Sequence, residues 1–129
     1  MTNLKRRCAA VGLHVLDESV MADVASVNVL LSHMPYWEEY EGAGEKRYKD
    51  YRPVAGEEFA LLCGHVHQYW KIRRTKDTGK IMYNVGVDVQ NYTPVSAEKI
   101  FEDINDFLFR EEHGAAPEET TTRTSNIGV

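Results

Sequence analysis

Residues 59–67 read Phe59-Ala60-Leu61-Leu62-Cys63-Gly64-His65-Val66-His67. The first five residues form a short apolar run of the kind found in buried β-strands. Gly64 allows the backbone to turn tightly as it leaves such a strand, so the segment predicts a strand that ends in a histidine-bearing loop. In an extended loop, His65 and His67 would point to the same side, about 6.6 Å apart along the backbone. That spacing suits a pair of metal ions about 3.5–4 Å apart, each bound by one imidazole.

Other segments predict the strands that surround this one. Apolar runs of strand character occupy residues 13–16 and 27–31. Residues 70–74 and 81–85 flank a turn-like Asp77-Thr78-Gly79 and predict a β-hairpin. The segment between Trp37 and Glu58 has no clear period of either kind, so it predicts a long surface loop.

Two helices are predicted, one near each end of the ordered region. Residues 3–11 carry apolar side chains at helical spacing and are followed by Gly12, a residue suited to the end of a helix. A clearer helix is predicted over residues 96–110, where Ser96 can cap the first turn. Its single apolar stripe consists of Ile100, Phe101, Ile104, Phe107 and Leu108. These elements together predict an α/β fold with a short mixed β-sheet and flanking helices.

Composition sets the class of protein. The 129 residues are 43% hydrophobic and 27% charged, which is typical of one globular domain with its own core. The net charge of −5 excludes a generic basic surface for nucleic acid. Two cysteines, the lack of a signal-peptide pattern and the lack of an apolar run of about 18 residues predict a cytoplasmic protein with no membrane partner. Residues 113–129 have little to bury and predict a disordered tail.

A third histidine follows another predicted strand, in Ser32-His33-Met34-Pro35. This segment, followed by Gly64-His65-Val66-His67 and then by Asn84-Val85-Gly86, resembles the C-terminal half of the calcineurin-like metallophosphoesterase family. The resemblance covers roughly residues 1–108 and is greatest to the short bacterial and phage-type members. It implies that residues 1–112 are half of that family's layered sandwich and that the protein is a phosphoric ester hydrolase.

The resemblance also implies a dinuclear metal site. In the family, the histidines matched by His33 and His65 bind one ion, and the histidine matched by His67 binds the other. Imidazole ligands suit manganese, iron or zinc. The implied substrate is a phosphate ester, so a nucleotide or nucleic acid is expected only as a substrate. Nothing in the sequence assigns substrate-binding residues.

Three motifs of the family have no counterpart here: Asp-x-His, Gly-Asp and Gly-Asn-His-Asp/Glu. Gly12-Leu13-His14 does not fit any of them. A two-metal hydrolase needs a bridging carboxylate, which three imidazoles do not provide. We therefore expect a fragment, from a split gene or a truncated gene model, that needs a second chain with the N-terminal half or self-association. The alternative is a non-catalytic remnant, a regulatory or binding module of the same fold.

Two further interpretations use residues near the motif. A structural zinc site of Cys63, His33, His65 and His67 would require the loop to curl, because an extended chain separates residues 63 and 67 by about 13 Å. A buried, inert Cys63 is the preferred interpretation. The basic side chains of segments 71–80 and 47–52 could contact phosphate or a nucleotide, but such patches are more typical of solvated surface.

Overall fold

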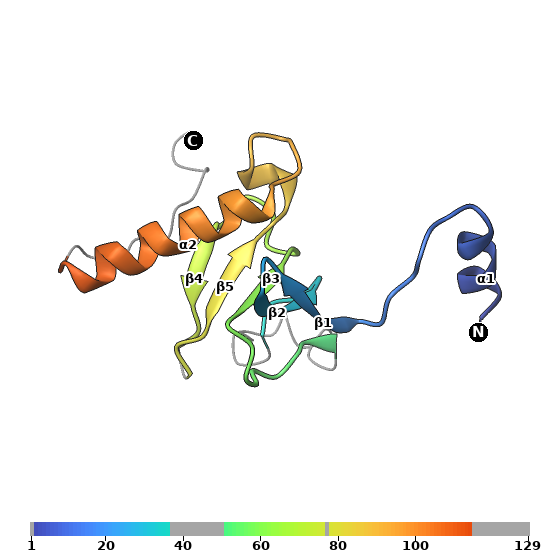
Figure 1. The fold of residues 1–129 in the computed structure, drawn as a ribbon, viewed down its shortest axis with the longest axis horizontal. Coiled ribbons are helices and arrows are strands. Elements are labelled where there is room, and N and C mark those ends of the chain that lie inside the picture. Colours follow the sequence, from blue (N-terminus) through green and yellow to red (C-terminus); the bar gives the residue numbers. More distant parts are fainter. Residues whose placement is uncertain (1, 37–50, 77, 115–129) are drawn as a thin grey trace.

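A computed structural model describes residues 2–36, 51–76 and 78–114 of the chain (Figure 1). In these residues one five-stranded sheet has the strand order β1-β2-β3-β5-β4. The elements are α1 (Asn3–Ala10), β1 (Ser19–Val24), β2 (Val27–Ser32), β3 (Ala60–Cys63), β4 (Ile72–Arg74), β5 (Ile81–Asn84), the 3-10 helix η3 (Val87–Val89) and α2 (Ala97–Glu112). The predicted α/β fold is confirmed, and no helix in the described part of the chain is long and apolar enough to cross a membrane.

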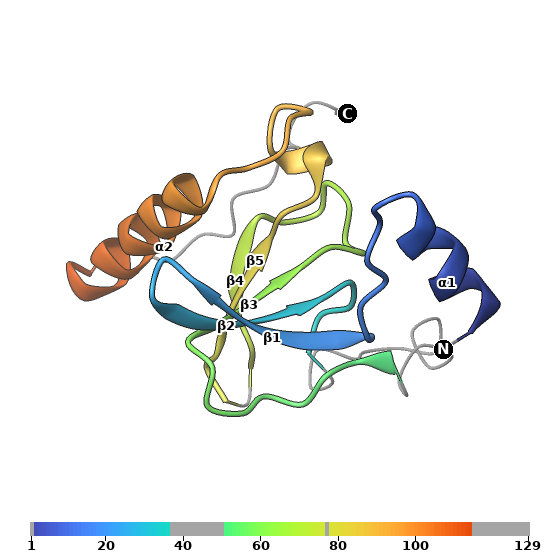
Figure 2. The ribbon, with the colours of Figure 1, turned by 45° about the vertical axis from the view of Figure 1, so that its right-hand side comes forward.

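The sheet is mixed, as predicted. Its three central strands β2, β3 and β5 are parallel, with Leu30 opposite Leu61 and Leu61 opposite Met82. The edge strands are antiparallel: β1 pairs with β2, and β4 pairs with β5 as the predicted hairpin (Figure 2). Because the central strands run in one direction, the loops that follow β2, β3 and β5 leave from the same edge of the sheet.

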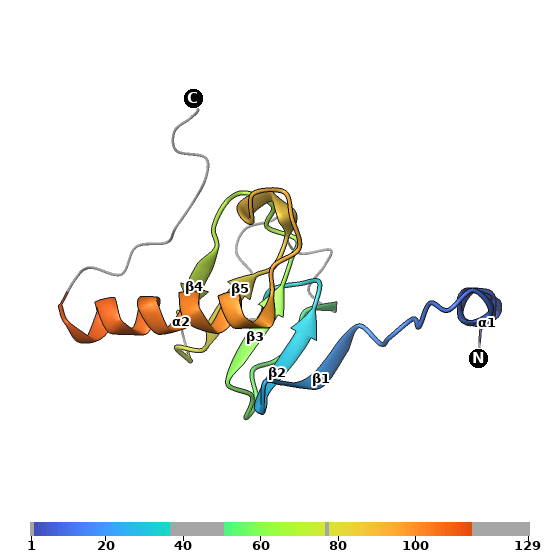
Figure 3. The same ribbon diagram turned by 45° about the horizontal axis from the view of Figure 1, so that its top comes forward.

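The helix α2 covers one face of this sheet (Figure 3). Its predicted stripe is confirmed, since Ile100, Ile104 and Phe107 are buried in one cluster. The cluster residues of β3 and of β5 are alternate residues of their strands, as expected for one face of a sheet. The strand residues that complete the cluster are Val29, Ala60, Leu62, Ile72, Ile81 and Tyr83. The predicted cap is also confirmed, because Ser96 Oγ accepts a hydrogen bond from Lys99 N–H (3.1 Å).

The opposite face has a second, smaller core. Leu30, Leu61 and Met82 lie there with Cys63, Tyr36 and Trp70. Glu58 is also buried, and its carboxylate accepts hydrogen bonds from Tyr36 Oη and from Gly56 N–H. The end of the predicted surface loop is therefore packed against the sheet, while its residues 37–50 lie outside the described residues.

The C-terminal end of α2 includes a residue assigned above to the tail. His113 is the C-cap of the helix, and its ring stacks on Phe109 with 3.9 Å between centroids. From residue 115 onward, the predicted disordered tail lies outside the described residues.

The N-terminal arm differs from the sequence prediction. The predicted helix is present as α1, but residues 13–16 form no strand, so that prediction was wrong. A strand needs a neighbour to accept its backbone hydrogen bonds, and the strand next to β2 is instead β1, which begins at Ser19. None of the α1 residues is buried, and Figure 1 shows this helix standing apart from the sheet.

A carboxylate network joins α2 to the sheet. Asp103 accepts a hydrogen bond from Tyr83 Oη (2.6 Å) and pairs with Lys71 Nζ (3.0 Å) and Lys99 Nζ (3.1 Å). Burial acts to raise the pKa of this carboxyl group. The hydrogen bonds from Tyr83, Lys71 and Lys99 outweigh burial and hold the pKa of Asp103 below its usual value.

This network predicts acid-sensitive stability. The folded-state pKa of Asp103 is lowered, so its contribution is fully present above the ordinary Asp pKa of about 4 and is lost as pH falls through the folded value. We expect Asp103→Asn to lower the free energy of unfolding by about 1–3 kcal/mol near neutral pH and to flatten its dependence on acid pH. Urea denaturation at several pH values measures both effects. Asp106→Asn, on an exposed position of the same helix, is the control; equal losses in both variants would contradict the network.

Candidate metal centre

The three histidines singled out by the sequence lie on loops at the carboxyl edge of the parallel strands. His33 follows β2 directly, and His65 and His67 follow β3. The turn from Gly86 to Asp88 follows β5 at the same edge. In α/β proteins, ligands commonly bind beyond the carboxyl ends of parallel strands, where loops from neighbouring strands meet.

His33 and His65 come close to each other. Their ring centroids are 5.5 Å apart and the rings are nearly perpendicular, at 81°. Gly64 makes this approach possible: its N–H donates to the carbonyl oxygen of His33 (2.9 Å), and a Cβ atom at this position would lie 3.3 Å from His33 Nδ1. A side chain at position 64 would therefore crowd the His33 ring.

The loop that carries His65 and His67 is turned rather than extended, so the predicted extended geometry was wrong. His65 has φ = 68° and His67 has φ = 50°, both in the left-handed region. Val66 N–H donates to the carbonyl oxygen of Gly64 (2.7 Å), which closes a tight turn around His65. Each such conformation costs about 1–3 kcal/mol in a residue with a side chain, so the surrounding structure must hold it in place.

Asn84 helps to hold the His67 end of this loop in place. It is fully buried at the end of β5, and its Nδ2 donates to the carbonyl oxygens of His67 (2.8 Å) and Trp70 (2.9 Å). Its Oδ1 accepts from Gly86 N–H (2.8 Å). One buried amide therefore ties the His67 loop to the turn that follows β5. The sequence singled out Asn84 only within the resemblance and assigned it no role.

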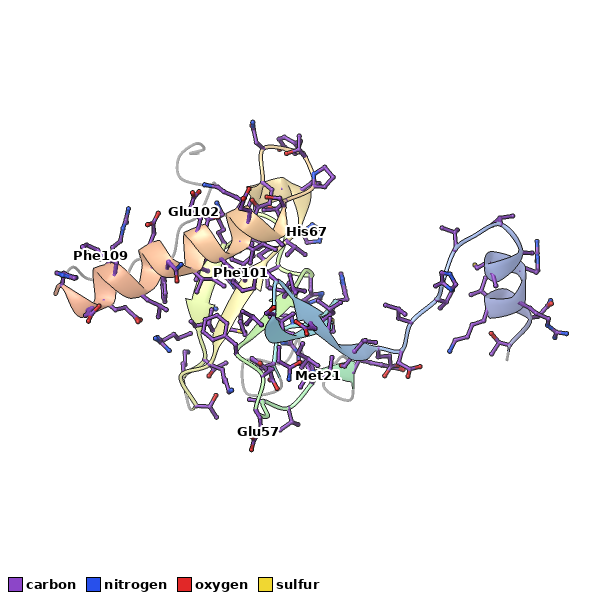
Figure 4. All side chains as sticks on the ribbon, in the orientation of Figure 1. Met21, Glu57, His67, Phe101, Glu102 and Phe109 are labelled. Atoms are coloured by element: carbon purple, nitrogen blue, oxygen red, sulfur yellow. The ribbon has the colours of Figure 1, made fainter. Side chains whose placement is uncertain are left out.

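His67 has a carboxylate partner that the sequence reasoning missed. Its Nδ1 lies 3.2 Å from Asp88 Oδ2. The side chain of His67 is 72% exposed, and Figure 4 shows it beside η3. The signal that could have found Asp88 is its place two residues after Gly86, in a loop leaving the same edge of the sheet as His67.

The structure thus brings two of the three predicted residues together, His33 with His65, and pairs the third, His67, with Asp88, which the sequence did not predict. Among the described residues, no three His, Cys, Asp or Glu side chains form a group placed to hold one ion. The zinc site that would include Cys63 is not formed either. Cys63 is buried in the second core, which confirms the burial predicted for that residue.

Two open hollows border on His33. One, of about 560 Å³, is lined by apolar side chains of the α2 face, including Leu31, Leu62 and Val85, and by Gly64 and Gly86. The other, of about 410 Å³, is lined by residues that include Tyr51 and His65. Glu18 lines both hollows. Their volumes fall in the range of small-ligand sites.

Most basic residues of the segment 71–80 have other partners. Lys71 pairs with Asp103, and Arg74 makes a two-pronged contact with Glu111, with nitrogen–oxygen distances of 2.8 Å. Arg73 lies over the Trp70 ring, 5.5 Å from its centroid. These contacts are those of a surface hairpin that packs against a helix. Residues 47–50 of the other basic segment lie outside the described residues.

Compared with protein-family models, curated proteins and solved structures, the chain gives no match. Its function therefore has to be inferred from the residues at the carboxyl edge of the sheet. In kind, these donors fit a borderline divalent metal ion, because imidazole is its common ligand. The set of ligands is incomplete, because the described residues include no carboxylate that bridges the histidines.

Proposed function

We propose that the chain is half of a metal-dependent phosphoesterase of the calcineurin-like class. In this proposal His33 and His65 bind one divalent ion and His67 binds a second, and a complementary part supplies the missing carboxylates. The observation that carries the proposal is the approach of the His33 and His65 rings, 5.5 Å apart, on loops from adjacent parallel strands. The left-handed backbone at His65 and His67 adds support, because strained residues cluster at functional sites.

Divalent ions bound by these residues would stabilise charge on a phosphate ester during its hydrolysis, and manganese, iron and zinc suit the imidazole donors. The chain's own part is to hold the donors. His33 and His65 meet because Gly64 leaves room for the ring. His67 is held through its backbone by Asn84 and through its ring by Asp88.

The chain alone should bind metal weakly. Neutral imidazoles bring no negative charge to offset a divalent ion, and the family motifs that would supply bridging carboxylates do not occur in the 129 residues. A complementary part with Asp-x-His, Gly-Asp and Gly-Asn-His-Asp would complete the ligand set. It could be a separate chain or another part of a longer one.

The N-terminal arm offers a surface for that complementary part. Its exposed apolar side chains include Leu4, Val11, Leu13 and Leu16, which are 60–75% exposed. Leu16 also lines the larger hollow next to His33, so the arm reaches the candidate site. Exposed apolar side chains beside a candidate site are typical of an interface, and covering them would stabilise the chain.

The alternative function is a non-catalytic binding module that keeps the sheet and the histidine pairs. The observation that favours it is the lack of the three carboxylate motifs from the sequence. The two functions predict the same weak metal binding by this chain, and they differ in what a complementary part restores.

A titration tests the metal site. When zinc is added to the full chain, we expect the imidazole NMR signals of His33, His65 and His67 to shift, because these three rings are the proposed donors. His14 on the N-terminal arm and His113 at the end of α2 are internal controls and should not shift. If His65 and His67 stay unmoved at millimolar zinc, the site assignment is wrong.

A further inference from the structure

We propose that Asp88 is a positioning residue for His67. It accepts a hydrogen bond from Nδ1–H and so leaves Nε2 as the metal donor. This inference deepens the proposed function and rests on it for the identity of the ligand. Asp88 belongs to none of the three carboxylate motifs considered above. Its contact is with Nδ1 of the His67 ring and not with Nε2, the proposed metal donor.

The contact itself determines which nitrogen carries the proton. Asp88 Oδ2 lies 3.2 Å from His67 Nδ1, and an ionised carboxylate can only accept a hydrogen bond. In the neutral ring the proton must therefore be on Nδ1 for the contact to be favourable. The lone pair is then on Nε2, and a histidine held in this way by a carboxylate is the common form of a metal ligand.

The pair of His67 and Asp88 contributes little to the stability of the fold. The side chains of His67 and Asp88 are 72% and 34% exposed, and ion pairs at such exposure contribute about 0–1 kcal/mol. Yet His67 keeps a left-handed backbone, and this conformation is unfavourable for a residue with a side chain. A weak contact to a residue with an unfavourable backbone conformation is expected if Asp88 serves to orient the His67 ring.

The backbones of both partners are held by the same buried side chain. Asn84 Nδ2 donates to the carbonyl oxygen of His67, and Asn84 Oδ1 accepts from Gly86 N–H, at the start of the turn that carries Asp88. Gln90, just after that turn, donates through Nε2 to the carbonyl oxygen of Asn84 (2.9 Å). The loop that carries the ring and the turn that carries the carboxylate are thus joined by hydrogen bonds of the buried Asn84 side chain, and not by the exposed pair alone.

The experiment uses the full chain with its histidines labelled with ¹⁵N. In the metal-free protein, at a pH well above the ordinary histidine pKa, we expect nitrogen shifts that report Nδ1–H for His67. Asp88→Ala should remove this tautomer preference and weaken zinc binding at His67 by about 10–100-fold, while the response of His33 changes less. Asp88→Glu should restore part of both effects. Glu102→Ala, which removes an exposed acid on α2, should change neither.

The outcomes separate this inference from the proposed function. A wild-type His67 protonated on Nε2, or a tautomer that does not change in Asp88→Ala, overturns the positioning role. Equal loss of zinc affinity at His33 and His67 also overturns it, because a general structural defect would act on both. If the tautomer behaves as expected but zinc shifts no histidine ring, the metal assignment falls while Asp88 is still supported as the residue that orients His67.

Discussion

The purified chain is expected to hydrolyse a generic activated phosphodiester no faster than free metal ion does, and a complementary chain is expected to restore hydrolysis. The reason is that a two-metal site needs bridging carboxylates, and the candidate site offers imidazoles without them. The complementary chain should carry Asp-x-His, Gly-Asp and Gly-Asn-His-Asp. Metal-dependent hydrolysis by the mixture, measured against each chain alone, tests the proposal.

Within the restored mixture, His67→Ala should return the rate to that of free metal, because it removes the only proposed ligand from this chain for one ion. His113→Ala is the matched control, since His113 lies at the C-cap of α2, outside the proposed site and the proposed interface, and it should leave the rate unchanged. A complementary chain that binds but never produces metal-dependent hydrolysis would favour the binding-module alternative. Hydrolysis by this chain alone that survives both His33→Ala and His65→Ala would place the chemistry outside the motif.

The second large effect is expected in the core. Ile104 is fully buried, at 0% exposure, between α2 and the sheet. Ile104→Ala should lower the free energy of unfolding by about 2–5 kcal/mol, because it removes buried methyl groups and leaves a cavity. Denaturant unfolding measured by circular dichroism gives this value.

Phe109→Ala is the matched control for that substitution. Phe109 is on the same helix but 59% exposed, so truncating it should cost less than about 0.5 kcal/mol apart from its stacking on His113. A loss for Ile104→Ala as small as that for Phe109→Ala would mean that α2 does not pack on the sheet through the predicted stripe.

Local patterns predicted the elements whose sequence periods are strong. The apolar stripe of α2 and its Ser96 cap are properties of a few neighbouring residues, and both appear in the structure. The runs that became β2, β3 and the β4–β5 hairpin were found for the same reason. Residues 13–16 have an equally apolar pattern but form no strand, because a strand also needs a partner and β1 takes the place beside β2.

In the candidate site, too, some features follow from the sequence and others only from the tertiary structure. The sequence by itself determined that histidines follow two strands and that a glycine precedes one of them, because these are facts of order along the chain. Tertiary structure alone decided that β2, β3 and β5 lie parallel and bring the loops to one edge. It also decided the left-handed turn at His65 and His67 and the contact of His67 with Asp88. The buried amide of Asn84 binds the loop of His67 to the turn of Asp88 through hydrogen bonds between residues up to 17 positions apart, and such long-range bonds leave no local sequence pattern.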